Sequence, residues 1–221
     1  MNYEQARFNM VEQQIRPWSV LDGTVLQIMG SIPRDTFVSD DVKPMAYADI
    51  EIPLAHNESM MFPRVEGRLL QELEIDIDDE CLEIGTGSGF VTACMATMAK
   101  HVHSIDIYDD FLQSASERLA DNNIANVLLE NKDIFNPALK IAKKYDAIAV
   151  TGSIPEYIPL FENLLKPQGR LFIVVGTGQT MHAMKVIRGE GEDHNTFART
   201  SLFETQLKPL VGVETKSSFS F

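Results

Sequence analysis

The sequence predicts an α/β protein with a Rossmann-like, doubly wound and mostly parallel sheet. From residue 80 onward, short apolar runs alternate with amphipathic stretches. Strands that alternate with helices form βαβ units, which build a parallel sheet with helices on both of its faces. Directly after the first apolar run comes a glycine-rich turn, LEIGTGSGF at 82–90, in the position where such sheets bind ligands.

The core is predicted to contain five buried strands joined by three helices. The strands are CLEI (81–84), HVHSIDI (101–107), NVLLE (126–130), YDAIAV (145–150) and GRLFIVVG (169–176). The helices are VTACMATMA (91–99), DFLQSASERLA (110–120) and YIPLFENLL (157–165). Segments 181–189 and 197–210 flank a polar turn, which predicts a C-terminal antiparallel hairpin. The last residues, 216–221, are expected to form a frayed tail.

The 221 residues fit one domain, with an N-terminal helical and loop extension (1–78) on the substrate side of a core at 79–221. Helices are expected over 3–15, over 20–32 with Asp22 as a candidate N-cap, and over about 65–74. Between them, residues 33–63 hold four prolines and no clear period, so they are expected to be loop with short elements.

Composition and charge exclude several classes of protein. The net charge is −13 and no Lys/Arg cluster stands out, which argues against a nucleic-acid substrate. Cys81 and Cys94 lack metal-ligand spacing and lie in apolar contexts, so buried thiols are expected and no metal site. The longest purely apolar run, 171–175, is too short to span a membrane, and no signal peptide is recognised. We therefore expect a cytoplasmic protein without a membrane partner.

The glycine turn is the strongest indication of a ligand. Glycines let the backbone turn sharply and let a ligand approach, and the following helix N-terminus offers unpaired N–H groups. The spacing is G-x-G-x-G after Glu83, whereas the dinucleotide fingerprint is G-x-G-x-x-G. A carboxylate at this entrance suits a ligand with an ammonium group and a sulfonium, so S-adenosylmethionine is the predicted cofactor. Glu83 would meet its amino group, directly or through water, and the turn (Gly85, Thr86, Gly87, Ser88, Gly89) would pass under the methionine moiety.

Two further carboxylates are assigned to the cofactor. Asp106, nineteen positions after Gly87, ends the second predicted strand and would accept from both ribose hydroxyls; the alternative is an acidic residue in a turn. Ile107, next to it, is also assigned to the cofactor site. Asp133 follows the third strand and would accept from the adenine amino group, with Ile134 and Phe135 packing the ring. A plain Asx turn at Asp133 is the alternative.

With these features the sequence resembles the class I methyltransferases, and more narrowly the protein-L-isoaspartate O-methyltransferase family. The resemblance runs almost end to end. It is carried by MVEQQIRP (10–17), VLQIMGSIPRDTFV (25–38), AYAD (46–49), LEIGTGSGF, YDAIAVTGSIPEYIP (145–159), LKPQGRLFIVVG (165–176) and LKPL (207–210). It implies methyl transfer to the free carboxylate of isoaspartyl residues in damaged proteins, after which the ester decomposes through a succinimide.

The chain departs from this family before Pro63. The family loop reads roughly Gln-Thr-Ile-Ser-x-Pro with an active-site serine, and the resemblance places Met61 at that serine and Glu58 at the glutamine. Methionine cannot donate a hydrogen bond to a carboxylate. Ser59 could take over, because residues 59 and 61 of an extended segment point to the same side; a solvated turn residue is the alternative. Thr151 is assigned to the substrate region by resemblance, or it caps the next helix.

Three functions remain open at this point. The first is an isoaspartyl O-methyltransferase, and the second keeps the cofactor but uses a small apolar acceptor suited to Met60, Met61 and Phe62. The third is a cofactor-binding protein with little or no turnover. Four further residues are minor candidates: Tyr47 and Asp49 for ordering a loop over the cofactor, His56 for chemistry, and Arg64 for binding a carboxylate. The oligomeric state is not predicted.

Overall fold

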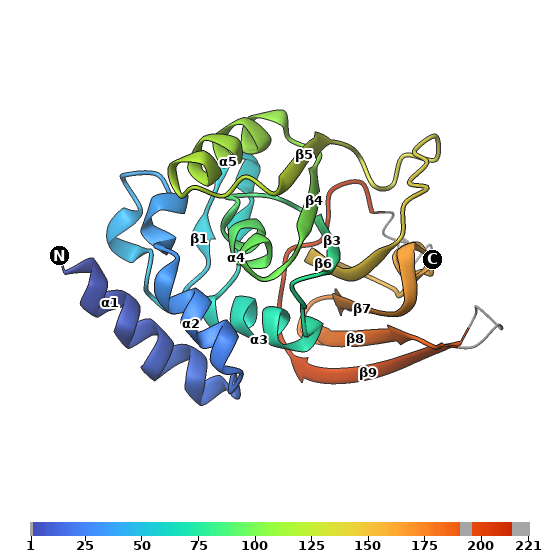
Figure 1. Ribbon diagram of the computed structural model, residues 1–221, viewed down its shortest axis with the longest axis horizontal. Helices are drawn as coiled ribbons and strands as arrows, with labels where there is room; N and C mark the ends of the chain where they lie inside the picture. Colours follow the sequence, from blue (N-terminus) through green and yellow to red (C-terminus); the bar gives the residue numbers. More distant parts are fainter. Residues whose placement is uncertain (1, 191–195, 214–221) are drawn as a thin grey trace, which may run out of the picture.

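The computed structural model describes residues 2–190 and 196–213, and it has the predicted fold class (Figure 1). One seven-stranded sheet has the order β5-β4-β3-β6-β7-β8-β9. Neighbours from β5 to β7 pair in parallel, whereas β8 and β9 form the predicted antiparallel hairpin. The strands are β3 (Glu80–Ile84), β4 (His101–Asp106), β5 (Val127–Asn131), β6 (Tyr145–Ile154), β7 (Leu165–Val175), β8 (His182–Arg188) and β9 (Phe197–Glu204). The expected tail at 216–221 lies outside the described residues.

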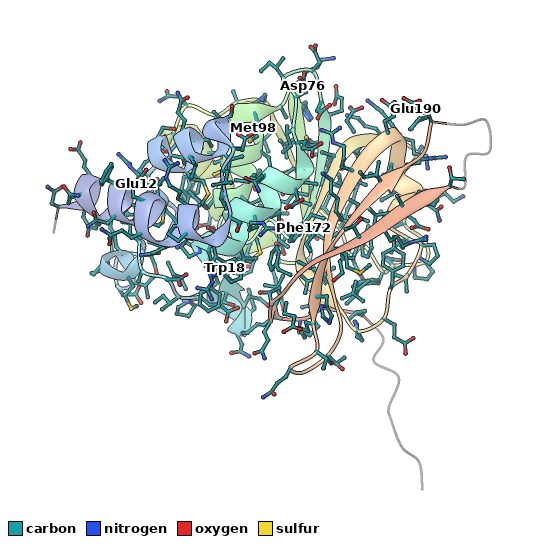
Figure 2. The ribbon with its side chains drawn as sticks, turned by 90° about the horizontal axis from the view of Figure 1, so that it is seen from below. Glu12, Trp18, Asp76, Met98, Phe172 and Glu190 are labelled. Carbon is teal, nitrogen blue, oxygen red and sulfur yellow. The ribbon has the colours of Figure 1, made fainter. Side chains whose placement is uncertain are left out.

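Two α-helices of the core connect β3 to β4 and β4 to β5, and three α-helices of the extension come before β3 in the described part of the sequence. They are α1 (Tyr3–Met10), α2 (Gly23–Ser31), α3 (Pro63–Leu73), α4 (Phe90–Met98) and α5 (Asp109–Asp121). Side chains of α1 to α4 share one core cluster with one face of the sheet. In Figure 2, Phe172 of β7 lies between these helices and the strands, and it is fully buried there.

The other face of the sheet is covered by irregular chain, where a helix was expected. Apolar side chains of β6 and β7 pack there against Phe135, Leu139 and Phe161. The helix predicted over 157–165 is wrong, because only Glu162–Leu164 forms a single 3₁₀ turn. Pro159 disfavours helical backbone at Ile158 directly before it, so a helix could begin only at Pro159 and would be too short to be stable by itself.

The N-terminal extension is largely as predicted, with changes at the helix ends. The helix expected over 3–15 becomes π-helical at Val11–Ile15. Asp22 caps α2, since its Oδ1 accepts a hydrogen bond of 2.9 Å from the Val25 amide. Helix α3 begins at Pro63, a residue suited to the first helical turn. Trp18 packs edge-on against Phe203 of β9, with ring centroids 5.3 Å apart, and so joins the extension to the hairpin.

The segment 207–210 was predicted as part of the hairpin, but it returns to the centre of the sheet. Strand β9 ends at Glu204. Beyond it, the Ser153 amide at the end of β6 donates to the Lys208 carbonyl (2.8 Å), and the Leu210 amide donates to the Ser153 carbonyl (2.9 Å). The Ser153 hydroxyl donates to the Leu207 carbonyl at 2.7 Å. These bonds fix the segment next to the carboxyl ends of the strands.

Candidate functional site

A cavity of about 920 Å³, counting the space open to solvent, lies at the carboxyl ends of β3, β4 and β6. The chain runs from β3 outward to β4 and β5, then crosses back to β6 on the other side of β3. Open α/β sheets bind ligands at this kind of reversal. The lining includes the cofactor residues predicted from the sequence except Gly89 and Phe135, together with Glu58, Ser59, Met60, Met61, Glu66, Tyr108, Phe111, Lys132, Thr151 and the segment 207–211.

The glycine turn forms the floor of the cavity, with the backbone that the sequence predicted. Gly85, Gly87 and Gly89 have φ values of 99°, 51° and 86°, which residues other than glycine rarely adopt. A Cβ on Gly85 would lie only 2.3 Å from Oγ1 of Thr151. That hydroxyl contacts the carbonyls of Gly85 and Ile84, at 2.6 and 2.9 Å. Thr151 therefore supports the turn, and its assignment to catalysis stays a prediction.

Glu83 lies fully buried beside this turn. Its Oε2 accepts hydrogen bonds from the hydroxyls of Ser104 (2.6 Å) and Thr92. Its Oε1 is also buried but has no hydrogen-bond partner among the described residues. Burial raises the pKa of Glu83 to about 8, in spite of the two hydroxyl donors. A buried acceptor left unpaired costs about 1–3 kcal/mol, so this oxygen is suited to a ligand that donates a hydrogen bond.

Asp106 and Asp133 lie at the strand ends, where the sequence placed them. The carboxylate of Asp106 accepts from the amides of Gly87 and Tyr108, both at 2.9 Å. Burial raises the pKa of Asp106, and these amide donors oppose the rise. Asp133 accepts from the Phe135 amide at 2.9 Å, so the Asx turn is present at a residue that also lines the cavity. Each carboxylate oxygen has a second lone pair for a ligand hydroxyl or amine.

The wall opposite the glycine turn is the segment Glu58–Met61. Within it, β2 (Ser59–Met60) pairs antiparallel with β1 (Ile52–Pro53). Met60 and Met61 are buried, at 5% and 4% exposure, and Ser59 is half-buried. Phe62, which was predicted to suit an apolar acceptor, is not part of the lining. It packs instead beneath the Arg64 guanidinium, 4.1 Å from the ring centre.

Behind this wall lies a buried ion pair that the sequence analysis missed. Arg34 and Glu66 are at most 1% exposed, and their two hydrogen bonds measure 3.0 and 3.1 Å. The same guanidinium donates to the carbonyls of Met61 and Ala46, both at 2.8 Å. Burial raises the pKa of Glu66, against the pull of Arg34. A signal was present, because Glu66 shares the apolar face of α3 with Leu69, at helical spacing.

The minor candidates lie at the rim or away from the cavity. His56 stacks face to face on Tyr108, with ring centroids 4.0 Å apart, and its Nε2 is 2.9 Å from Asp110. Arg64 pairs with Asp49, and neither residue lines the cavity. The remaining candidate, Tyr47, also lies outside the lining, and its hydroxyl donates to Asp35 at 2.5 Å.

Residues 2–190 and 196–213 have neither a metal site nor a membrane-spanning helix. Within these ranges, no cluster of three or more His, Cys, Asp or Glu side chains is placed to hold a metal ion. No helix there has the length and apolar character needed to cross a membrane. Cys81 and Cys94 are free and buried, as the sequence predicted, and burial raises the pKa of both thiols.

Comparison with known proteins gives one consistent result. The sequence model of the protein-L-isoaspartate(D-aspartate) O-methyltransferase family matches residues 5–214. A protein-L-isoaspartate O-methyltransferase of Protochlamydia amoebophila is 34% identical over 206 residues, which cover 93% of this chain and 96% of that protein. One of Opitutus terrae is 32% identical, covering 87% of this chain and 84% of that protein.

A similar fold is found among solved structures. A Plasmodium falciparum chain superposes on this chain with a TM-score of 0.75. That chain is named as a protein-L-isoaspartate O-methyltransferase and was solved in complex with S-adenosyl-L-homocysteine. The match covers 95% of this chain and 98% of that chain, at 18% sequence identity.

Proposed function

Since the chain belongs to the protein-L-isoaspartate(D-aspartate) O-methyltransferase family, we propose that it methylates the free carboxylate of isoaspartyl residues in proteins and peptides. It is an S-adenosylmethionine-dependent methyltransferase. The observation that carries the proposal is one continuous cavity, which joins the glycine turn at 85–89 to the wall at 58–61. A methyl donor and an acceptor have to meet in such a space.

The residues of the cavity fit the cofactor. Glu83 has a buried oxygen without a donor, which suits the cofactor's amino group. Gly85, Gly87 and Gly89 have the positive φ values that shape the turn, and a Cβ on Gly85 or Gly89 would clash with Thr151 or Ala115. Asp106 would hold the ribose hydroxyls, and Asp133 with Ile134 would hold the adenine. When bound, S-adenosylmethionine supplies an electrophilic methyl group on a sulfonium.

The protein's contribution to methyl transfer is alignment and exclusion of water. With the cofactor held by Glu83, Asp106 and Asp133, an acceptor carboxylate oxygen would bond to the methyl carbon as the carbon–sulfur bond breaks, and the electron pair of that bond would stay on sulfur. The carboxylate is already ionised at neutral pH, so no residue has to remove a proton. Met60 and Met61 would supply a dry wall against the acceptor, and Arg34 holds that wall in place through the Met61 carbonyl.

A small apolar acceptor is the second candidate, and the two buried methionines favour it. Methionine side chains are flexible and adapt to the shape of an apolar ligand. Met61 has no hydrogen-bond donor to orient a carboxylate, which is the specific reason for retaining this alternative. Ser59, half-buried in the same wall, is the nearest hydroxyl in sequence that could serve a carboxylate acceptor.

Radiolabelled methyl transfer to an isoaspartyl peptide tests the proposal. We expect incorporation as a base-labile ester, with none in the matched aspartyl peptide. Calorimetry with S-adenosylhomocysteine provides the control for an intact cofactor site. Cofactor binding without transfer to the isoaspartyl peptide would contradict the proposal and favour the small acceptor.

A further inference from the structure

Lys208 is the cation at the acceptor side of the cavity. The segment 207–211 lines the cavity, and the bonds of Ser153 to this segment fix its backbone. From there the Lys208 ammonium reaches across and donates to the carbonyl of Asn57, directly before the wall at 58–61. The ammonium therefore lies between the two sides of the mouth.

The lining of the cavity holds more acidic than basic side chains, so a lysine there is unusual. Five carboxylates belong to the lining: Glu58, Glu66, Glu83, Asp106 and Asp133. Two lysines, Lys132 and Lys208, are the lining cations among the described residues. Lys132 is paired with Glu130 at 2.7 Å. Among the residues that the structure describes, Lys208 forms no direct ion pair.

An ammonium group has three donors, and the Asn57 carbonyl occupies one of them. Two donors remain for a ligand. Burial raises the pKa of Glu58 and of Glu51, and the positive charge of Lys208 opposes both rises, so its field reaches these acidic side chains. A negatively charged acceptor would be repelled by Glu58, and Lys208 offsets that repulsion.

We propose that Lys208 binds the carboxylate of the methyl acceptor and selects for acceptors that carry this charge. The inference rests on the proposed isoaspartyl activity. It supplies the donor that Met61 cannot provide. Methyl transfer removes the negative charge from the carboxylate, so the ion pair is stronger before the transfer than at the transition state. Lys208 therefore acts on acceptor binding more than on the rate of the bound complex.

Steady-state kinetics on an isoaspartyl peptide test this role. For Lys208→Gln we expect KM for the peptide to rise about tenfold while kcat stays the same or rises, because the ion pair is weaker at the transition state. Lys208→Arg should recover most of the loss, because it keeps the charge. Lys143→Gln is the matched control; it removes the same charge from a surface pair with Glu80, outside the cavity, and should behave as wild type.

A second measurement separates carboxylate recognition from a purely structural bridge to Asn57. A peptide with a carboxamide in place of the acceptor carboxylate serves as a competitive ligand. Lys208→Gln should weaken binding of the carboxylate peptide and leave binding of the carboxamide peptide unchanged. If Lys208→Gln weakened binding of both peptides equally, or left KM unchanged, the proposed role of Lys208 would be wrong. The proposed isoaspartyl activity would not be affected by that result. If the wild-type protein does not methylate the isoaspartyl peptide, the proposed function fails, and this inference fails with it.

Discussion

The buried Arg34 guanidinium donates a hydrogen bond of 2.8 Å to the carbonyl oxygen of Met61, so one side chain links the interior of the extension to the wall of the cavity. The same guanidinium is paired with Glu66, and both side chains are at most 1% exposed. The segment Glu58–Met61 is therefore held in place by the guanidinium of Arg34, which is buried from solvent.

Removing one partner of this pair should be strongly destabilising. For Glu66→Gln we expect a loss of about 3–5 kcal/mol in the free energy of unfolding, because the Arg34 charge is left buried without its counter-ion. The double variant Arg34→Met/Glu66→Met should lose less than the two single losses combined. Urea unfolding of wild type, Glu66→Gln, Arg34→Met, Glu66→Met and the double variant measures these losses. Strict additivity of the two losses would contradict the pairing.

The glycine turn should not tolerate a side chain at position 85. Gly85→Ala places a methyl group 2.3 Å from Oγ1 of Thr151 and adds the strain of a positive φ, about 1–2 kcal/mol. We expect at least a tenfold loss in affinity for S-adenosylhomocysteine, measured by calorimetry. Gly23→Ala is the matched control, since nothing lies within 4 Å of its added methyl group. If both variants bind as wild type does, the turn does not hold the cofactor.

Glu83 should make the stability of the protein depend on pH. Its pKa in the folded protein is about 8, above the ordinary value of 4.5. The folded state therefore binds more protons than the unfolded state between these pH values, and this group lowers stability as the pH rises through that window. The slope is on the order of 1.4 kcal/mol per pH unit. Glu83→Gln should flatten it and be more stable than wild type at pH 8 to 9.

The same carboxyl group should couple cofactor binding to proton release. A cofactor ammonium favours ionised Glu83, whereas the free protein holds this group mostly protonated at neutral pH. Calorimetry of S-adenosylhomocysteine binding at pH 7, in buffers of different ionisation enthalpy, reports the protons released. We expect more protons released by wild type than by Glu83→Gln. The assignment of Glu83 to the amino group would fail if the two proteins released equal numbers.

Position 61 should control activity on isoaspartyl peptides. Met61→Ser introduces a hydroxyl donor at the wall, and we expect a higher kcat/KM on the isoaspartyl peptide. Met61 is 4% exposed, so truncation also leaves a cavity, which costs about 2–5 kcal/mol of stability. Met61→Ala creates a similar cavity without the hydroxyl and is the control. If kcat/KM rose equally in both variants, the effect would come from the larger cavity and not from the added hydrogen bond.

The parts of the site that were predictable from sequence are those made by neighbouring residues. Glu83 lies near the end of one strand, Gly85 follows that strand directly, and Asp106 ends the next, so strand periodicity was enough to place them at one sheet edge. Arg34 was not assigned a role, because its partner is 32 positions away. Lys208 was missed for a related reason: its place depends on the return of 207–210 to the end of β6, which no local pattern encodes.

The helix predicted over 157–165 fails for a different physical reason. Its apolar spacing is that of a helix, and two of its apolar residues, Phe161 and Leu164, are buried against the sheet. Burial alone does not require helical backbone. Pro159 makes the regular form unfavourable, and an irregular segment covers the same apolar surface.

Trp18 is the only tryptophan in the sequence. It lies where the extension meets the rest of the protein, with Phe203 at one edge and the Arg64 guanidinium 4.9 Å from its ring centre. The molecule therefore contains a built-in optical reporter of a single junction. Selective excitation of the indole follows the loss of the contact between Trp18 and β9 during unfolding, and no dye or engineered label is needed.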